Sequence, residues 1–288
     1  MAFSRVGSAS MAVSVILLGL LFRIASGVPG PSPIFHELFQ PSWAEDHFIH
    51  EGEVVKLKLD NYSGAGFASK NKYLYGKVSV QMKLVPGDSA GTVTAFYMSS
   101  DGEKHNEFDF EFLGNSSGEP LLVQTNVYVN GEGDREQRMG LWFDPTADFH
   151  TYSLHWNLRQ VVFMVDETPI RVMKNSEVRG NPFPKGQPMG IYSSIWNADN
   201  WATQGGIVKI NWGNAPFVVS YKNFNIDACQ HPTNGDAGRC GSNVAELSVH
   251  QKNQLKWVKK RHMVYDYCSD VQRFQAMPGE CKHYRHRN

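Results

Sequence analysis

An acidic, aromatic stretch at residues 105–115 carries the side chains most able to do chemistry. Its acids are Glu107, Asp109 and Glu111, and a phenylalanine follows each of them. Successive side chains of a β-strand point to opposite faces, so an extended stretch would place all three carboxyl groups on one face. Like charges on one face repel and raise one another's pKa. A pair of carboxyl groups held at different pKa values is the apparatus that cleaves a glycosidic bond.

Retaining hydrolysis needs a carboxylate nucleophile and a carboxylic acid, about 5–5.5 Å apart. Glu107 and Glu111 lie four residues apart. On a straight strand their Cα atoms would be about 13 Å apart, and long side chains that lean together on a concave, twisted sheet would close much of that gap. Asp109 is expected to hydrogen-bond one glutamate and keep it ionised, while Glu111 holds its proton. The alternative is a charged solvent face, but a strand selected for stability alone avoids three acids without a base.

Short β-prone runs separated by Gly, Asn, Asp and Pro make up most of the chain. The expected strands cover residues 54–59, 76–84, 92–98, 108–112, 122–129, 152–156, 160–165, 189–194 and 217–224. Helical periodicity is missing from this region, and many short strands at regular spacing indicate an all-β sandwich or barrel. After Cys229, a polar, glycine-rich loop precedes a helix-compatible segment at 244–262.

That helix-compatible segment is rich in cations, namely Lys252, Lys256, Lys259, Lys260 and Arg261. The preferred interpretation is a solvated helix face. The alternative is a basic patch that attracts an acidic polysaccharide.

The amino terminus has the features of a secretory signal. Arg5 precedes an apolar run from Met11 to Phe22, and small residues follow at 25–27, so residues 1–27 are expected to be removed on export. The run is short for a membrane span and no later stretch approaches about twenty apolar residues, so we expect no membrane association. Lys+Arg and Asp+Glu balance at 28 each, which argues against nucleic-acid binding.

In an exported protein, cysteines and N-glycosylation sequons are both informative. An even cysteine set in an exported chain indicates disulfides, and the four cysteines are Cys229, Cys240, Cys268 and Cys281. Of three possible pairings we favour the sequential one, 229 with 240 and 268 with 281; a zinc site is the alternative, but it lacks Cys-x-x-Cys spacing. Asn115 and Asn61 each begin an N-glycosylation sequon.

Aromatic and amide side chains are suited to holding a sugar chain. Trp196 and Trp201 lie within a polar stretch that precedes Gly205 and is interpreted as a loop, so their rings favour a ligand platform over core. Gln124 and Asn126 share one face of a predicted strand, which suits a groove wall.

Together these motifs resemble the plant xyloglucan endotransglucosylase/hydrolases, a branch of glycoside hydrolase family sixteen. The resemblance is carried, in order over nearly the whole mature chain, by residues 105–115, 124–126, 133–137, 141–145, 192–199, 264–268 and Arg273. It implies a concanavalin-like jelly-roll sandwich at 28–227, with a long cleft across the concave sheet. A C-terminal extension at 228–288, containing a helix and held by two disulfides, would follow.

Carried over position by position, the resemblance implies that Glu107 is the nucleophile, Asp109 the helper and Glu111 the acid/base. It also implies glucan contacts for Glu111 and for Gln124, Thr125, Asn126, Asp134, Arg135, Glu136, Asn200, Trp201, Gly205 and Arg273. Further cleft residues would be Trp196, Tyr97 and Tyr265, and Asn115 resembles the glycosylation site of the family. One departure, Gln204 where arginine is frequent, leaves the subsite preference open.

The implied reaction cuts the β-1,4-glucan backbone of xyloglucan with retention and joins the new end to a second xyloglucan chain, remodelling the plant cell wall from the apoplast. We expect a monomer with xyloglucan donor and acceptor as partners, without cofactor or metal. The lengthened loop of strongly hydrolytic members has no counterpart between residues 201 and 221, which favours transfer. The alternatives are a predominantly hydrolytic endoglucanase and a non-catalytic polysaccharide-binding protein.

Overall fold

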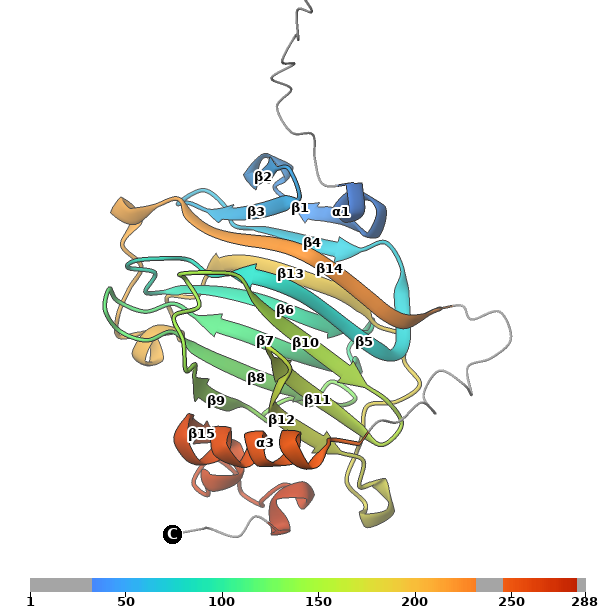
Figure 1. Ribbon diagram of the computed structural model, residues 1–288. Helices are drawn as coiled ribbons and strands as arrows, with labels where there is room; N and C mark the ends of the chain where they lie inside the picture. Colours follow the sequence, from blue (N-terminus) through green and yellow to red (C-terminus); the bar gives the residue numbers. More distant parts are fainter. Residues whose placement is uncertain (1–32, 232–245, 284–288) are drawn as a thin grey trace, which may run out of the picture.

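Two antiparallel β-sheets lie face to face in the computed structural model, which describes residues 33–231 and 246–283 (Figure 1). Sheet A has the order β1 (Phe39–Trp43), β4 (Ala65–Ser69), β13 (Gly190–Asn197), β6 (Thr92–Ser99), β7 (Glu107–Leu113), β8 (Leu122–Tyr128), β9 (Gln137–Gly140) and β15 (Met263–Asp266). Sheet B has the order β12 (Thr168–Lys174), β11 (Gln160–Val165), β10 (His150–Trp156), β5 (Lys72–Lys83), β14 (Phe217–His231), β3 (Val54–Leu59) and β2 (Phe48–Glu51). The all-β sandwich expected from the sequence is confirmed.

Helices are short and peripheral. The α-helices are α1 (Pro33–Leu38) and α3 (Val249–Arg261), and the 3-10 turns are η1 (Glu45–His47), η2 (Glu177–Arg179), η3 (Thr203–Gly206), η4 (Trp212–Asn214), η5 (Tyr267–Ser269) and η6 (Gly279–His283). A capping box starts α3, because Ser248 Oγ accepts from the Gln251 amide while the Gln251 side chain accepts from the Ser248 amide. Within the described ranges, no helix is long and apolar enough to cross a membrane.

The phenylalanines of the acidic stretch form the centre of the core, as their alternation predicts. Phe108 and Phe110 are fully buried. Their rings meet Trp156 and Phe163 of sheet B edge to face, with centroids 5.3 Å apart in each pair. Burying a large apolar side chain contributes about 1.5–3 kcal/mol. Core packing therefore fixes the face of β7 that points inward, and with it the face that carries the acids.

The C-terminal extension is part of the sandwich rather than a separate body. Strand β15 pairs with β9 and forms the last strand of sheet A, although more than a hundred residues separate the two in sequence. Strand β14 continues to His231 and so runs through the boundary expected at residue 228. The Cys268–Cys281 disulfide is present. The pairing of Cys229 with Cys240 and the signal peptide at 1–27 involve positions outside the described residues.

Candidate active site

The three acids of β7 lie side by side on the face of sheet A that points away from the core. Strand pairing places Asp109 opposite Tyr97 of β6 and Asn126 of β8. All three carboxyl groups line one cavity of about 360 Å³. The remaining lining residues are Trp43, Ala95, Tyr97, Ser194 and Trp196. The pleat thus brings the predicted catalytic acids together with two indoles and a phenol, which is the composition of a sugar-binding site.

Asp109 is the most buried of the three acids, with 6 % of its surface exposed. Burial raises its pKa well above the usual range, and the charges of Glu107 and Glu111 raise it further. Burial also raises the pKa of Glu107, while hydrogen bonds with Ser99 and Asp109 lower it. A neutral Asp109 can donate a proton to a hydrogen bond with Glu107. The arrangement therefore favours an ionised Glu107 beside a protonated Asp109.

Glu111 is held by a chain of side-chain hydrogen bonds. The Gln124 amide donates from Nε2 to Oε2 of Glu111, and Arg138 Nε donates to Oε1 of Gln124 at 2.6 Å. Because Arg138 occupies the amide oxygen, the NH₂ group of Gln124 must face Glu111. Burial raises the pKa of Glu111, and this hydrogen bond opposes the rise. A raised pKa in a carboxyl group that remains hydrogen-bonded suits a general acid.

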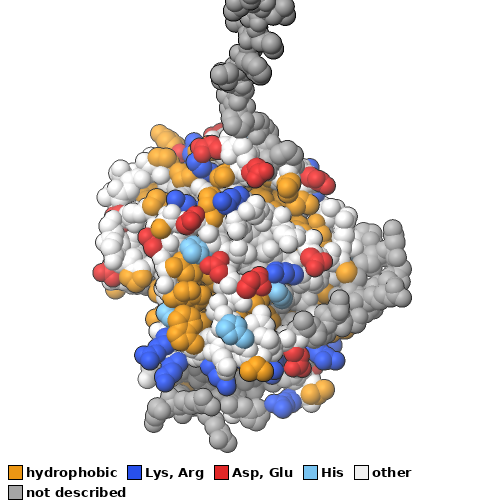
Figure 2. Space-filling model, in the orientation of Figure 1, with side chains coloured by type: hydrophobic (Ala, Val, Ile, Leu, Met, Phe, Trp, Pro, Cys, Tyr) orange, Lys and Arg blue, Asp and Glu red, His pale blue; other side chains and the backbone are white. Residues whose placement is uncertain are grey.

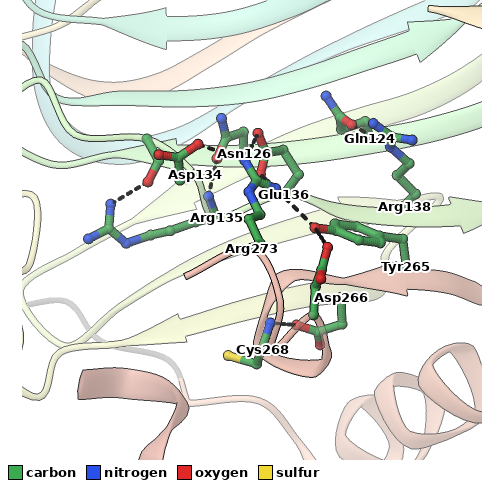
Figure 3. Close-up of polar contacts among 12 residues, drawn as sticks. Gln124, Asn126, Asp134, Arg135, Glu136, Arg138, Tyr265, Asp266, Cys268 and Arg273 are labelled. Atoms are coloured by element: carbon green, nitrogen blue, oxygen red, sulfur yellow. Dashed lines mark hydrogen bonds and ion pairs between the residues drawn. The ribbon is translucent and has the colours of Figure 1, made fainter. Parts of the chain in front are cut away.

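Residues from the C-terminal extension contact the segment that leads into β9 (Figure 3). Arg273 forms ion pairs of 2.6 Å with both Asp134 and Glu136, and its Nη1 donates to the Tyr265 hydroxyl at 3.0 Å. The charge of Glu136 in turn raises the pKa of Glu111. Four of the predicted contact residues therefore form one network, next to the acid and outside the lining of the carboxylate cavity.

Two predicted contact residues have their side chains occupied elsewhere. Arg135 is 7 % exposed and pairs with Glu280 of the extension at 2.8 Å. Thr125 is fully buried on the core face of β8, where its carbonyl and hydroxyl oxygens accept from Arg171 Nη1 at 2.8 and 3.1 Å. Successive side chains of a strand point to opposite faces, so Thr125 points away from the face that carries Gln124 and Asn126. Its side chain therefore supports the cleft wall from behind and does not line it.

The tryptophan platform is built differently from the expected loop. Strand β13 continues to Asn197, so Trp196 stands on a strand and lines the carboxylate cavity. Trp201 follows in a turn and packs with Trp196 around a small apolar cluster. Asn200 and Gly205 are exposed beside them, and Gly205 has a φ of 68°, which glycine adopts without steric cost.

Both predicted glycosylation asparagines lie outside the strands. Asn61 is exposed in a bend, which the Asp60 carboxylate organises by accepting from two backbone amides. Asn115 is half-buried after the end of β7, where its side-chain amide donates to the Pro120 carbonyl at 3.0 Å.

The structure adds site residues that the sequence reasoning missed. Arg138 lies two positions after Glu136, so strand alternation was a signal for it. Ser194 likewise lies two positions before Trp196. Trp43 had no local signal, because β1 joins the site through pairing with β4. Arg171, which supports Thr125 from sheet B behind the site, had none either. Among the described residues, no group of three or more His, Cys, Asp or Glu side chains could hold a metal ion.

Comparison with known proteins agrees with this geometry. The profile of glycosyl hydrolases family 16 matches residues 35–214, and that of the xyloglucan endo-transglycosylase C-terminus matches residues 235–281. The chain is 65 % identical over 291 residues to xyloglucan endotransglucosylase protein 6 of Diospyros kaki, covering 96 % of this chain and 97 % of the relative. It is 62 % identical over 280 residues to xyloglucan endotransglucosylase/hydrolase protein 9 of Arabidopsis thaliana, covering 94 % and 97 %.

Solved structures share the fold at low sequence identity. The β-glucanase of Bacillus licheniformis superposes with a TM-score of 0.55 at 24 % identity, covering 66 % of this chain and 92 % of the glucanase. The Crh5 transglycosylase superposes with a TM-score of 0.58 at 21 % identity, covering 70 % and 82 %. The fold, the acidic row on β7 and the matched segments agree, and the chain belongs to glycosyl hydrolases family 16, in the branch of the xyloglucan endotransglucosylase/hydrolases.

Proposed function

We propose that this protein is a xyloglucan:xyloglucosyl transferase. It cleaves the β-1,4-glucan backbone of xyloglucan with retention and transfers the new end to another xyloglucan chain. The observation that carries the proposal is the row of Glu107, Asp109 and Glu111 along one cavity. The relatives named as xyloglucan endotransglucosylases, which match the chain over almost its full length, supply the substrate class.

Glu107 acts as the nucleophile in the first half of the reaction. Its carboxylate attacks the anomeric carbon of a backbone glucosyl unit while Glu111 gives its proton to the departing 4-oxygen. The bond to the leaving fragment breaks and a glycosyl-enzyme ester forms. Asp109 holds the nucleophile through the hydrogen bond described above.

Glu111 acts as a base in the second half. It removes the proton from the 4-hydroxyl of an acceptor end, whose oxygen attacks the anomeric carbon of the glycosyl-enzyme. The new glycosidic bond forms as the bond to Glu107 breaks, and Glu107 leaves as a carboxylate. Water competes at this step, and the acceptor wins when bound sugar has a high effective molarity. We assign that holding role to Tyr265, Arg273 and Glu136, whose network lies beside the acid. The segment after Trp201 is compact, because η3, η4 and β14 follow one another closely.

We also propose that the protein is exported to the plant cell wall as a monomeric glycoprotein. The amino-terminal signal features, the sequons at Asn115 and Asn61 and the sequential cysteine pairing support this location. Asn115 lies at the end of the catalytic strand, so a glycan there would flank the cleft without entering it.

A size-shift assay on xyloglucan, with and without a labelled xyloglucan oligosaccharide, tests the activity. Transfer predicts that the label enters polymer and that polymer size falls only when the oligosaccharide is present, without a matching rise in reducing ends. Reducing ends that appear at the same rate without acceptor would make the protein a hydrolase. Binding with no change in polymer size would exclude an enzyme.

A further inference from the structure

A second groove lies between α3 and the loops that follow β10 and β12. Its volume is about 720 Å³, and it shares no lining residue with the carboxylate cavity. Its apolar lining consists of Leu158, Val172, Val178, Leu247 and Leu255. Leu158 and Val178 are 42 % and 98 % exposed, so apolar surface is available to a ligand.

Cationic side chains predominate among the charged residues of this groove. They are Arg159, Lys174, Lys252, Lys256 and Lys259. The two acids are already paired, Glu177 with Lys185 at 2.7 Å and Glu246 with Lys252 at 3.8 Å. The other four cations make no ion pair with any acid in the described part of the chain. Figure 2 shows lysine and arginine side chains gathered along the lower edge of the molecule, around α3.

The lysines form a line rather than a cluster. Lys252, Lys256 and Lys259 are spaced four and then three residues apart on α3, which places them on one helix face. At 1.5 Å rise per residue the second and third lie about 6 and 10 Å along the axis from the first. A row of this kind matches an anion that repeats along a chain better than a single compact anion.

We propose that this groove binds a linear carboxylated polysaccharide, a polyuronate, and anchors the protein to it. Carboxylates of successive sugar rings face the lysine row, and the C–H faces of the rings lie against Leu158 and Val178. Charges set beside an apolar groove suit a chain that enters it, whereas a flat anionic bilayer needs an outward patch. The site is separate from the proposed transfer reaction, so the protein can act on one polymer while it is held by another.

Paired charge reversals test the site. The groove variant is Lys252→Glu with Lys256→Glu. The matched control is Lys56→Glu with Lys58→Glu on β3, which changes net charge equally but lies at the other end of sheet B from β12. Electrophoretic retardation is measured in gels that contain de-esterified polygalacturonate or its methyl-esterified, uncharged form.

We expect polygalacturonate to retard both the wild type and the control variant. The esterified, uncharged polymer should retard neither protein. The groove variant should bind roughly tenfold or more weakly, and 1 M salt should abolish binding because the Debye length falls to about 3 Å. Unchanged binding by the groove variant, or equal loss in the control, would overturn the site. Equal or tighter binding to heparin, DNA or anionic vesicles would overturn the choice of polyuronate.

Measuring the xyloglucan transfer rate of the groove variant distinguishes failure of this proposal from failure of the proposed function. Neither lysine lines the carboxylate cavity, so the groove variant should keep the wild-type transfer rate and thermal midpoint. Loss of polygalacturonate binding with full transfer supports the groove. Loss of both would indicate a misfolded variant, and the single Lys256→Glu change, with the midpoint intact, then decides whether binding still weakens.

Discussion

At the scale of single residues, the site depends on how three similar carboxyl groups are made different. All three have raised pKa values, with burial as the first cause. Their hydrogen-bond partners distinguish them. Hydrogen bonding with Ser99 and Asp109 lowers the pKa of Glu107, Glu111 receives a hydrogen bond from Gln124, and Asp109 Oδ1 is buried without a partner. One acid can thus ionise first while another keeps its proton, which a double-displacement reaction requires.

Replacement of the nucleophile gives the most direct test at this scale. Glu107→Gln keeps the size of the side chain but removes the attacking oxygen, so transfer and hydrolysis should both fall by more than about a thousandfold. The thermal midpoint should be unchanged. Labelled-oligosaccharide incorporation is the measurement, and Glu119→Gln in an exposed turn is the control. Retained activity in Glu107→Gln would remove the assignment.

Arg138 tests whether the orientation of Gln124 matters to the acid. In Arg138→Met the amide is free to rotate and the nearby positive charge is lost, so the pKa of Glu111 should rise. The alkaline limb of kcat/KM, which reports the protonated acid, should then move upward by up to about one pH unit. Arg179→Met on the exposed η2 turn is the matched control. An alkaline limb that stays in place would show that Arg138 acts only on substrate binding.

At the scale of secondary-structure elements, the sequence predicted the strands that consist of β-prone, largely apolar residues. The runs at 54–59 and 160–165 match β3 and β11 at both ends. Strands β1, β2, β4, β9, β12 and β15 were not predicted, because most are short or carry Gly and Pro, and tertiary pairing decides their conformation. The predicted helix begins at Val249 rather than at residue 244, since the capping box fixes its start.

The sequence likewise predicted only the part of the candidate site that depends on local strand geometry. Alternation alone placed Glu107, Asp109 and Glu111 on one face, because the period of a strand is a local property. It could not place Arg171, which reaches Thr125 from sheet B across the core. Nor could it show that Arg135 pairs with Glu280 rather than facing the cleft. Contacts between segments distant in sequence depend on the packing of the whole fold.

The disulfide of the extension provides the prediction at the element scale. Cys268 and Cys281 are 13 residues apart in sequence, and closing a loop of about this length stabilises a fold by about 3 kcal/mol in the chain-entropy description. The double change Cys268→Ser with Cys281→Ser should therefore lower the urea midpoint and the folding yield. The transfer rate of the folded fraction at low temperature should change much less. An unaltered urea midpoint would contradict a stabilising role.

At the scale of the whole molecule, the buried acid makes stability depend on pH. The pKa of Asp109 is higher in the folded protein than in the unfolded chain, so the folded state binds more protons. Its contribution to stability is fully present below about pH 4, the usual range of the group, and is lost as pH rises through the raised pKa. Active-site chemistry thus lowers the stability of the fold at neutral pH.

Asp109→Asn removes this titration while keeping the shape of the side chain. The variant should turn over slowly, and its thermal midpoint relative to wild type should increase as pH rises from below 4 to neutrality. Midpoints measured across that range for both proteins are the test, with Asp148→Asn at an exposed position as control. Curves that run parallel over the whole range would show that Asp109 is ionised alike in both states.

The pairing of β15 with β9 has a consequence for how such enzymes diversify. Tyr265 and Arg273 come from the last fifth of the chain, whereas the three carboxyl groups of β7 come from its second fifth. Exchanging residues 263–281 between relatives would transplant a block of the wall to which we assign the incoming sugar, and would leave the proposed catalytic carboxylates in place. The choice of acceptor would then be transferred together with this C-terminal segment, which recombination could exchange as a unit.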